Sequence, residues 1–391
     1  MRIEAISSPS DCEAFREEWE ALHNNIRPQM PFSSPLWNLT WWKHYSKNSL
    51  AANYSFFLHT VRDAQGSLIA VVPWMITTRP GFGPLKIRTL NYFGADQSIT
   101  EIRGVICEPQ NEAAVIAALL RYLQEGNFQF DIVDWMYVGD PSAVETLEQK
   151  TPLSFCQINS IYILSLKTSW TALYSGFSSS TKKYMRRSYE KVTETKQKFK
   201  FSIVSDASEY PEAMARFFRL HTARASSVDM FAHPDKFTHE KNRQFIYDIF
   251  ESLFSTRSAI IFELRLGDKV VACRLGFISG NSIYIYYSGY DPRWRNYSVG
   301  TVLMIEAVKW SISNNFTEFN LSAGKDRSKL RWKPREFIYQ SGFQVRPGFR
   351  GSVISHCYQL FKKGGISRHK INKKTQPHAP RHNDAGRDRT E

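Results

Sequence analysis

Residues 284–309 read YIYYSGYDPRWRNYSVGTVLMIEAVK, and this stretch decides how the fold is interpreted. Its first part has the composition of a strand, and a polar loop follows it. A turn of small residues, Ser298 to Thr301, then opens an amphipathic helix. The start of a helix after such a loop presents free backbone N–H groups and a positive dipole end, which suit a pyrophosphate. One glycine can equally be a simple tight turn, so the spacing leaves both interpretations open.

Strand and helix signals alternate on both sides of this stretch. The clearest is a hairpin, 258–266 and 270–279, turning at Gly267-Asp268-Lys269 and followed by a strand at 282–290. We also expect helices at 9–25, 112–125, 179–198, 210–224, 237–253 and 301–313. Residues 31–45 read as a turn followed by a helix, with Ser34 as the cap and Pro35 at the first helical position. Further strands are expected at 54–61, 67–76, 87–93, 130–138, 161–166, 199–204 and 316–321. This mixture predicts an α/β (mixed α+β) fold.

The order of elements begins again near residue 160, which predicts two domains of one fold. We expect domains at 1–160 and 161–360, a division that fits a chain of 391 residues. Residues 361–391 have few apolar side chains and no periodicity, so we expect a disordered basic tail.

The positive charge is unevenly distributed. The chain has 51 Lys and Arg against 37 Asp and Glu, a formal net charge of +14. Three blocks, 181–200, 325–350 and 361–391, each have a net charge of +6, so the rest of the chain is slightly acidic. Such blocks suit an anion, whether nucleic acid, an anionic membrane or a phosphorylated small molecule, although each block alone can be an ordinary solvated face.

Several classes of protein are disfavoured by the composition. We find no secretory signal at the N-terminus and no apolar run long enough to span a membrane. Five widely separated cysteines argue against a disulfide framework or a zinc site, and nothing suggests a metal cluster. These features predict a cytoplasmic protein without a metal.

Several segments resemble a known family. Residues 262–332 resemble the GNAT-related acetyltransferases of the CelD/BcsL type, relatives of the FemAB aminoacyl transferases. The matching segments are FELRLGDKVVACRLGF (262–277), YYSGYDPRW (286–294), YSVG (297–300) and GKDRSKLRW (324–332). Further matches are PFSSPLWNLTWWKHY (31–45), TKKYMRRSYEKV (181–192) and FFRLHTAR (217–224).

The resemblance implies two tandem GNAT-like domains, with acetyl-CoA as the acyl donor in the C-terminal one. By this resemblance, strands part near 288–291 to admit the donor, and Lys329 stabilises charge at the reacting carbonyl. The residues implied to bind the donor are Arg295, Ser298, Val299, Gly300 and Thr301. The chain departs from the family pattern because residues 295–300 contain a single glycine, Gly300, and because Ser328 stands where Tyr is common.

Acyl transfer needs an acid and a base, and three residues are candidates. Tyr290 and Asp291 follow a strand beside the implied thioester site, but Asp291-Pro292 can also merely start a turn. His221 lies on an expected helix three residues before Arg224, so both can face one cleft, although such a histidine is more often structural.

Three arginines are candidates for binding the acceptor substrate. Arg186 and Arg187 lie on the basic helix, and Arg224 lies beside His221 in sequence. A solvated basic face is the alternative for Arg186 and Arg187.

The sequence and the resemblance together predict a cytoplasmic acyl-CoA-dependent N- or O-acyltransferase. Its acceptor would be a small molecule or glycan precursor in exopolysaccharide or cell-envelope biosynthesis. Two alternatives remain open: a FemAB-like transferase that uses aminoacyl-tRNA, and a non-catalytic protein that binds its partner by charge.

Overall fold

The structure of this 391-residue chain is a computed structural model. It describes residues 1–81, 85–95, 99–150, 153–227, 234–346, 348 and 350–354, with the backbone alone at 150 and 153–156. Met1–Gln344 form one compact unit, and a second unit, Val345–Glu391, contributes a few described residues. The disordered tail expected at 361–391 lies outside the described residues.

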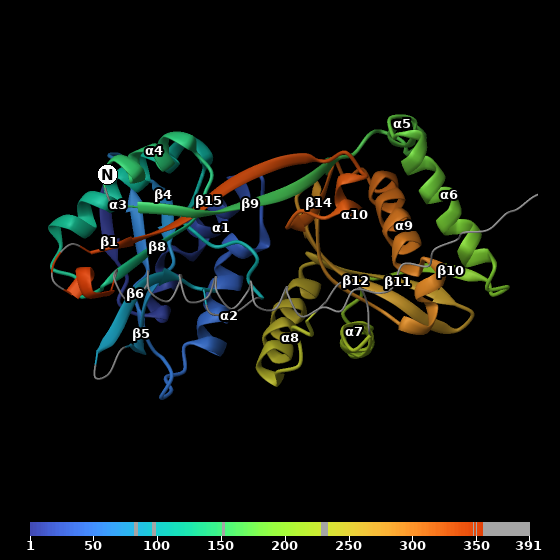
Figure 1. The fold of residues 1–391 in the computed structure, drawn as a ribbon, viewed down its shortest axis with the longest axis horizontal. Coiled ribbons are helices and arrows are strands. Elements are labelled where there is room, and N and C mark those ends of the chain that lie inside the picture. Colours follow the sequence, from blue (N-terminus) through green and yellow to red (C-terminus); the bar gives the residue numbers. More distant parts are fainter. Residues whose placement is uncertain are drawn as a thin grey trace, which may run out of the picture. The chain divides into compact units, whose positions relative to one another are not determined.

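The first half of the chain combines short strands with four helices in the described part (Figure 1). Helix α2 (Pro35–Tyr45) follows Ser34, whose hydroxyl accepts a hydrogen bond from the backbone N–H of Trp37 at 3.1 Å. Pro35 occupies its first position, as the sequence predicts. The other elements are β1 (Arg2–Ala5), η1 (Pro9–Phe15), α1 (Arg16–Asn25), η2 (Pro31–Ser33), β2 (Asn53–Phe56), β3 (His59–Arg62), β4 (Leu68–Val72), β5 (Trp74–Pro80), β6 (Lys86–Tyr92), β7 (Ile106–Cys107), η3 (Pro109–Asn111), α3 (Glu112–Glu125), β8 (Ile132–Val138) and α4 (Pro141–Lys150).

The second half contains the predicted hairpin and the predicted strand–loop–helix segment. Gly267 and Gly280 turn the chain with φ of 56° and 52°, a conformation that favours glycine. The elements are β9 (Leu153–Ser165), α5 (Trp170–Ser175), α6 (Ser179–Thr193), β10 (Phe199–Val204), α7 (Tyr210–Ala225), α8 (Glu240–Ser255), β11 (Ala259–Leu266), β12 (Lys269–Ser279), β13 (Ser282–Tyr290), η4 (Pro292–Tyr297), α9 (Val299–Ser313), β14 (Glu318–Ala323), α10 (Arg327–Leu330) and β15 (Arg335–Val345).

The strands form two sheets. The small sheet has the order β1-β3-β4-β7, and the large one has the order β10-β11-β12-β13-β14-β9-β15-β8-β6-β5-β2. Strand β9 crosses residue 160 without a break, and β15 pairs with it over most of its length. The mixed α/β fold predicted from the sequence is therefore present, while a domain boundary near residue 160 stays a prediction.

Helices cover both faces of the second-half sheet. Figure 1 shows α6 and α9 on one face and α7 and α8 on the other. Alternate residues of β11 divide between the two cores: Ile260 and Phe262 pack with α9, and Ala259 and Ile261 pack with α7 and α8. Both faces are buried, which explains why β11 is apolar at nearly every position.

Strands β13 and β14 lie side by side only at their beginnings. They pair in parallel from Ser282 with Glu318 to Tyr284 with Asn320, and the described register ends there. The later residues of the two strands, 285–290 and 321–323, diverge. This divergence opens the sheet beside the start of α9.

Some elements differ from the sequence predictions. Strand β15 and helix α4 were not predicted, and the strand expected at 67–76 is divided into β4 and β5 at Pro73. Proline has no N–H to donate to a sheet ladder, which accounts for that break. The strand expected at 54–61 is likewise two strands, β2 and β3, which belong to different sheets. No helix in the described residues is long and apolar enough to cross a bilayer.

Candidate functional site

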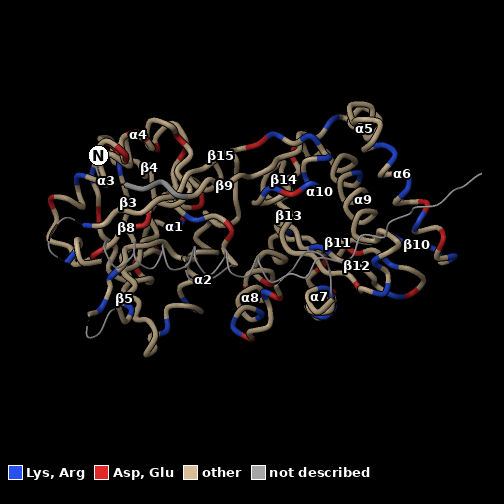
Figure 2. Tube along the Cα trace, in the orientation of Figure 1, with Lys and Arg blue, Asp and Glu red and all other residues tan. Residues whose placement is uncertain are grey.

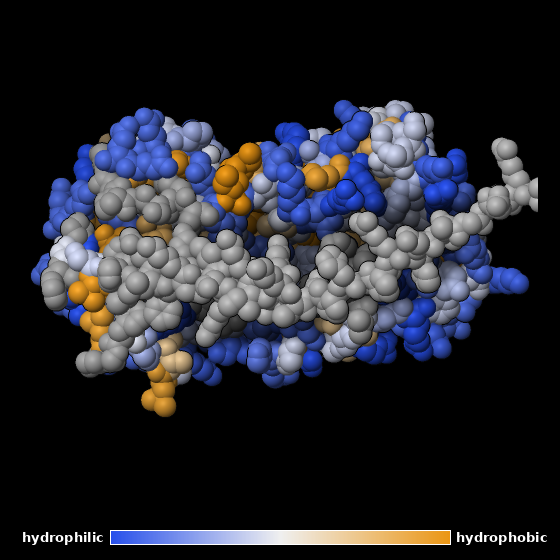
Figure 3. Space-filling model, in the orientation of Figure 1, coloured by the Kyte–Doolittle hydropathy of each residue, from blue (hydrophilic) through white to orange (hydrophobic). Residues whose placement is uncertain are grey.

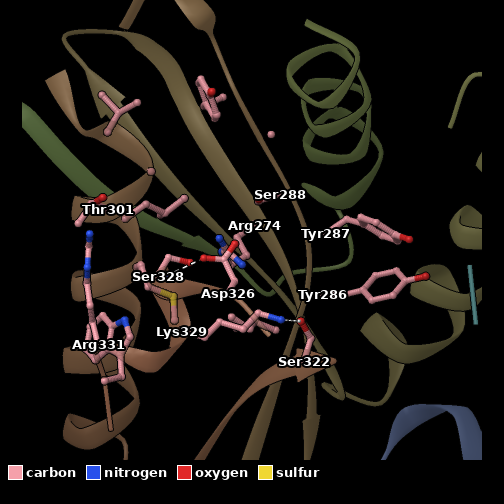
Figure 4. Close-up of a pocket in the computed structure, with 18 of the residues that line it drawn as sticks. Arg274, Tyr286, Tyr287, Ser288, Thr301, Ser322, Asp326, Ser328, Lys329 and Arg331 are labelled. Carbon is pink, nitrogen blue, oxygen red and sulfur yellow. Dashed lines mark hydrogen bonds between the residues drawn. The ribbon is translucent and has the colours of Figure 1, made fainter. Parts of the chain in front are cut away.

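A cavity of about 740 Å³ lies where β13 and β14 diverge. Its walls are the end of β13, the end of β14, the start of α9, helix α10 and the first turns of α6 (Figure 4). This cavity contains a mixture of aromatic, small and charged side chains. It is large enough for part of a nucleotide-sized ligand.

The start of α9 forms one wall. Ser298 has a left-handed backbone (φ 57°, ψ 27°), which ends η4 and begins α9. The amide N–H groups of Val299 and Gly300 donate no hydrogen bond to another described backbone group, as expected in the first turn of a helix. A Cβ placed on Gly300 would meet no atom within 4 Å, so this glycine faces open space. The hydroxyl of Tyr184 on α6 lies 2.8 Å from that of Thr301.

Lys329 projects into the cavity from α10. Asp326 caps this short helix by accepting a hydrogen bond from the N–H of Ser328 at 2.6 Å. The Nζ of Lys329 donates to the carbonyl oxygen of Ala323 at 2.5 Å and to the hydroxyl of Ser322 at 3.2 Å (Figure 4). Burial lowers the pKa of Lys329 to about 8.

Glu101 also lines the cavity, although the sequence analysis did not select it. Its carboxylate accepts hydrogen bonds from the hydroxyl of Tyr284 and from the N–H of Ala323, the latter at 3.3 Å. Burial raises its pKa, and the hydrogen bond from Tyr284 opposes that change. No local signal marks this residue, because its partners lie about two hundred positions away in the chain.

Arg274 is a second residue that the sequence analysis missed. It lies on β12 directly across from Ser288 on β13 and lines the cavity. Its buried Nε has no hydrogen-bond partner in the described structure. Burial and the positive charge of Arg224 lower the pKa of Arg274 to about 10. An arginine in the middle of an otherwise apolar strand is the signal that could have found it.

Three further predicted residues line this cavity. The guanidinium of Arg224 donates to the hydroxyl of Ser288 at 2.7 Å and lies 5.3 Å from the ring centre of Tyr290. Both Arg224 and Tyr290 line the cavity, as does Arg295. These side chains therefore stand together with Lys329 and the start of α9.

His221 does not line the main cavity. Its Nδ1 lies 3.0 Å from the carbonyl oxygen of Ser288, and its Nε2 accepts a 3.4 Å hydrogen bond from the N–H of Lys236. It lines a separate cavity of about 130 Å³ with Arg224 and Tyr287. His221 therefore contacts the backbone of β13 from outside the main cavity.

Asp291 is likewise outside the lining of the main cavity. Its carboxylate caps η4 by accepting a hydrogen bond from the N–H of Arg293 at 3.1 Å, and it binds the guanidinium of the same residue at 2.6 Å. These hydrogen bonds hold its pKa below the usual range. Asp291 thus forms the turn that leads into η4.

Arg186 and Arg187 lie on the outer face of α6. Both are exposed, and Arg186 lies 3.5 Å from Glu190 in an i,i+4 ion pair. Thr181, Tyr184 and Met185 of the same helix line the cavity instead, because successive residues of a helix point in different directions. Figure 2 shows Lys and Arg along α6, and Figure 3 shows a largely hydrophilic surface over this side of the molecule.

The lining of the main cavity is strongly positive. Its described charged residues are Glu101, Arg224, Arg274, Arg295, Lys325, Asp326, Lys329 and Arg331. Six cations against two carboxylates favour an anionic ligand. Among the residues that the structure describes, no group of His, Cys, Asp and Glu could hold a metal ion.

Comparison with protein families gives one match in this region. Residues 179–333 match the acetyltransferase (GNAT) domain. The segment begins at α6 and ends just after α10, so it includes nearly all of the main cavity. The match supports an acyltransferase whose main cavity lies in a segment similar to the GNAT acetyltransferase domain. No curated protein matches the chain.

Solved structures share the fold over most of the chain. FemX is 10% identical with a TM-score of 0.57, covering 92% of this chain and 99% of its own. A conserved protein of unknown function from Bacteroides thetaiotaomicron is 11% identical with a TM-score of 0.50, covering 88% and 100%. A tandem GNAT protein from the clavulanic acid biosynthesis pathway is 10% identical with a TM-score of 0.46, covering 89% and 100%. At these identities the likeness concerns the fold alone.

Proposed function

We propose that this acyltransferase moves an acyl group from acetyl-CoA, or a related acyl-CoA, to an amine or hydroxyl group in the main cavity. The observation that carries the proposal is the divergence of β13 and β14 around a positive cavity within the GNAT-matched segment. The helix start at Val299 and the ammonium group of Lys329 both lie on this cavity.

The start of α9 fits the phosphates of such a donor. The amides of Val299 and Gly300 are available there, and the open space at Gly300 lets a ligand approach the backbone closely. Arg295 and Arg331 are exposed at the same cavity and would add positive charge. We therefore assign donor binding to Arg295 and to Ser298, Val299, Gly300 and Thr301.

Lys329 and Tyr290 are our candidates for the reaction itself. Acyl-CoA would supply a thioester carbonyl, the group that an amine or hydroxyl attacks. The Lys329 ammonium would stabilise negative charge on that carbonyl oxygen in a partly buried site, where a fixed cation acts strongly. Tyr290 would protonate the leaving sulfur. Asp291 and His221 would support the site from outside the cavity.

Arginine side chains indicate where the acceptor would bind. Arg224 lies in the cavity beside Tyr290 and would bind an anionic group of the acceptor. Arg186 and Arg187 would act at the outer surface, where they are exposed. We propose a precursor in exopolysaccharide or cell-envelope biosynthesis, modified in the cytoplasm, on the basis of the resemblance of residues 262–332 to the CelD/BcsL type.

A second donor deserves a direct comparison. The fold shared with FemX and the basic residues along α6 favour an aminoacyl-tRNA donor as the alternative. Binding to tRNA through such a surface would fall steeply with salt, because bound counterions are released.

The experiment that separates the two donors is calorimetric titration of the full chain with acetyl-CoA and, separately, with tRNA. We expect saturable binding of acetyl-CoA that tRNA does not displace. Release of free thiol in the presence of candidate acceptors would then identify the substrate. Absence of heat at millimolar acetyl-CoA, together with tight and salt-sensitive tRNA binding, would overturn the proposal in favour of the alternative.

A further inference from the structure

Glu101 comes from a part of the chain that otherwise lies away from the main cavity. Every other described residue that lines the cavity is at position 181 or beyond. Glu101 lies outside the GNAT-matched segment, after β6 of the first half. Its carboxylate nevertheless lies close enough to Lys329 for the two charges to influence each other.

Glu101 holds the end of β14 in place. It accepts hydrogen bonds from the N–H of Ala323 and from the hydroxyl of Tyr284, which lies on β13 just where the paired register with β14 ends. The neighbouring Ser322 has a left-handed backbone with φ of 65°, and its N–H donates to Asn320 at 2.9 Å. The chain is thus bent at this point, and Glu101 anchors the bend to the adjacent strand.

The other side of Ala323 holds Lys329. The carbonyl oxygen of Ala323 accepts the 2.5 Å hydrogen bond from the Lys329 ammonium, and Ser322 accepts the second bond. The direction of that carbonyl therefore decides where the ammonium group lies. A displacement of about 1 Å in such a group is enough to reduce catalysis severely.

The charges around Lys329 act in opposite directions. The carboxylates of Glu101 and Asp326 favour its protonated form, whereas burial and the guanidinium of Arg274 disfavour it. These groups belong to the first half, to the cap of α10 and to β12. Glu101 is the larger of the two favourable influences.

We propose that Glu101 is a positioning residue for Lys329: by binding Ala323 and Tyr284 it fixes the carbonyl that holds the Lys329 ammonium, and it places a carboxylate near that group. The first half of the chain therefore supplies an essential part of the acyl-transfer site. This inference rests on the role given to Lys329 in the proposed function.

The test measures the ionisation of Lys329 directly, without a donor or an acceptor. The full chain is labelled with dinitrofluorobenzene over a range of pH, and mass spectrometry follows the peptide that contains Lys329. We expect a pKa near 8 in the native chain. Glu101→Gln should lower this pKa, and Arg274→Met should raise it, because each removes one neighbouring charge.

Glu112→Gln is the matched control. Glu112 is also a carboxylate in the first half that accepts backbone hydrogen bonds, from Gly139 at 3.0 Å and Asp140 at 2.6 Å. It lines a separate cavity of about 530 Å³ and does not line the main one. Its substitution should leave the pKa of Lys329 unchanged, which separates a local charge effect from general loss of structure.

Tyr284→Phe provides a second route if Glu101→Gln does not fold. It removes the hydroxyl that orients the carboxylate, and we expect a smaller change of the same sign. The inference is overturned if the pKa of Lys329 is unchanged in the folded Glu101→Gln variant. If that variant does not fold, an unchanged pKa of Lys329 in folded Tyr284→Phe overturns it. If the labelling gives the expected result but the chain does not bind acetyl-CoA, the proposed function alone is overturned.

Discussion

The carboxylate of Glu101 and the ammonium group of Lys329 bind the same residue, Ala323, from opposite sides. Glu101 accepts a hydrogen bond from its N–H at 3.3 Å, and Lys329 donates to its carbonyl oxygen at 2.5 Å. Ala323 ends β14, the strand that diverges from β13. The opening in the sheet and the charged groups at its edge are thus one connected structure.

Replacing Lys329 with methionine should reduce turnover without unfolding the protein. The substitution keeps the length of the side chain and removes the charge, so we expect about a 10²- to 10³-fold lower kcat. The affinity for acetyl-CoA should change little, because the donor contacts are assigned to α9. Steady-state assays of thiol release and calorimetric titration measure the two effects.

Lys325→Met is the control for this change. Lys325 is exposed at the same cavity, four residues earlier, so the substitution removes an equal charge. We expect a raised KM and an unchanged kcat. If both variants lost kcat equally, the specific role of Lys329 would be wrong.

The rate of acyl transfer should fall as the pH rises above about 8. The pKa of Lys329 is lowered from 10.5 to about 8, so the group is a cation below that pH and neutral above it. A reaction that needs the cation therefore loses rate on the alkaline side. The measurement is the pH profile of kcat/KM for acetyl-CoA, followed as thiol release.

Lys329→Arg should remove this alkaline decline, because a guanidinium remains charged throughout the range. The altered geometry of the guanidinium lowers the overall rate at every pH, so the shape of the profile, and not its height, tests the role of the charge. An identical decline in both proteins would mean that another group titrates.

Placing a carboxylate at Gly300 should weaken donor binding. The position faces open space, so Gly300→Asp can be accommodated, and an acidic residue in the first turn favours the helix itself. Repulsion of the donor phosphates should lower the affinity for acetyl-CoA about tenfold, or about 1.4 kcal/mol. Calorimetric titration measures the affinity, and thermal unfolding checks the fold.

Ser169→Asp is the control for the Gly300 variant. Ser169 is exposed and caps α5 through the N–H of Ala172, so aspartate can replace it as a cap. The substitution adds the same charge at the start of another helix, and Ser169 does not line the main cavity. Equal loss of affinity in both variants would argue against donor binding at α9.

A methyl group at Gly289 should destabilise the protein. A Cβ there would lie 2.5 Å from the backbone N of His221 and 2.6 Å from the backbone carbon of Leu220, so α7 must move away from β13. We expect Gly289→Ala to lower the free energy of unfolding by about 2–3 kcal/mol.

Gly300→Ala is the matched control for Gly289→Ala, because its new methyl group would meet no atom within 4 Å. Urea unfolding of both variants measures the difference. Equal stability of the two would show that α7 and β13 do not approach as closely as described.

Local signals in the sequence predicted much of the fold. Ser34 and Pro35 mark the start of α2, and the glycine turns mark the ends of the β11–β12–β13 segment. Strand β15 was missed because charged residues at its start, Arg335 and Glu336, made the region look like a continuation of the basic segment.

The site was only partly predictable, because a local pattern does not reveal which way a side chain faces. Lys329, Tyr290 and Arg224 line the main cavity, whereas His221 and Asp291 do not. The roles of all five stay predictions. Glu101 could not be found this way, since the residue it binds, Ala323, is 222 positions away.

The order of the large sheet has a consequence for the synthesis of the protein. Among the described strands, β15 joins the group that ends at β9 to the group that begins at β8. Its residues, Arg335–Val345, are made after every other strand in that sheet. The sheet must therefore remain in two segments on the ribosome until translation has passed residue 345. Until then, the edges of β8 and β9 that pair with β15 in the complete sheet are exposed.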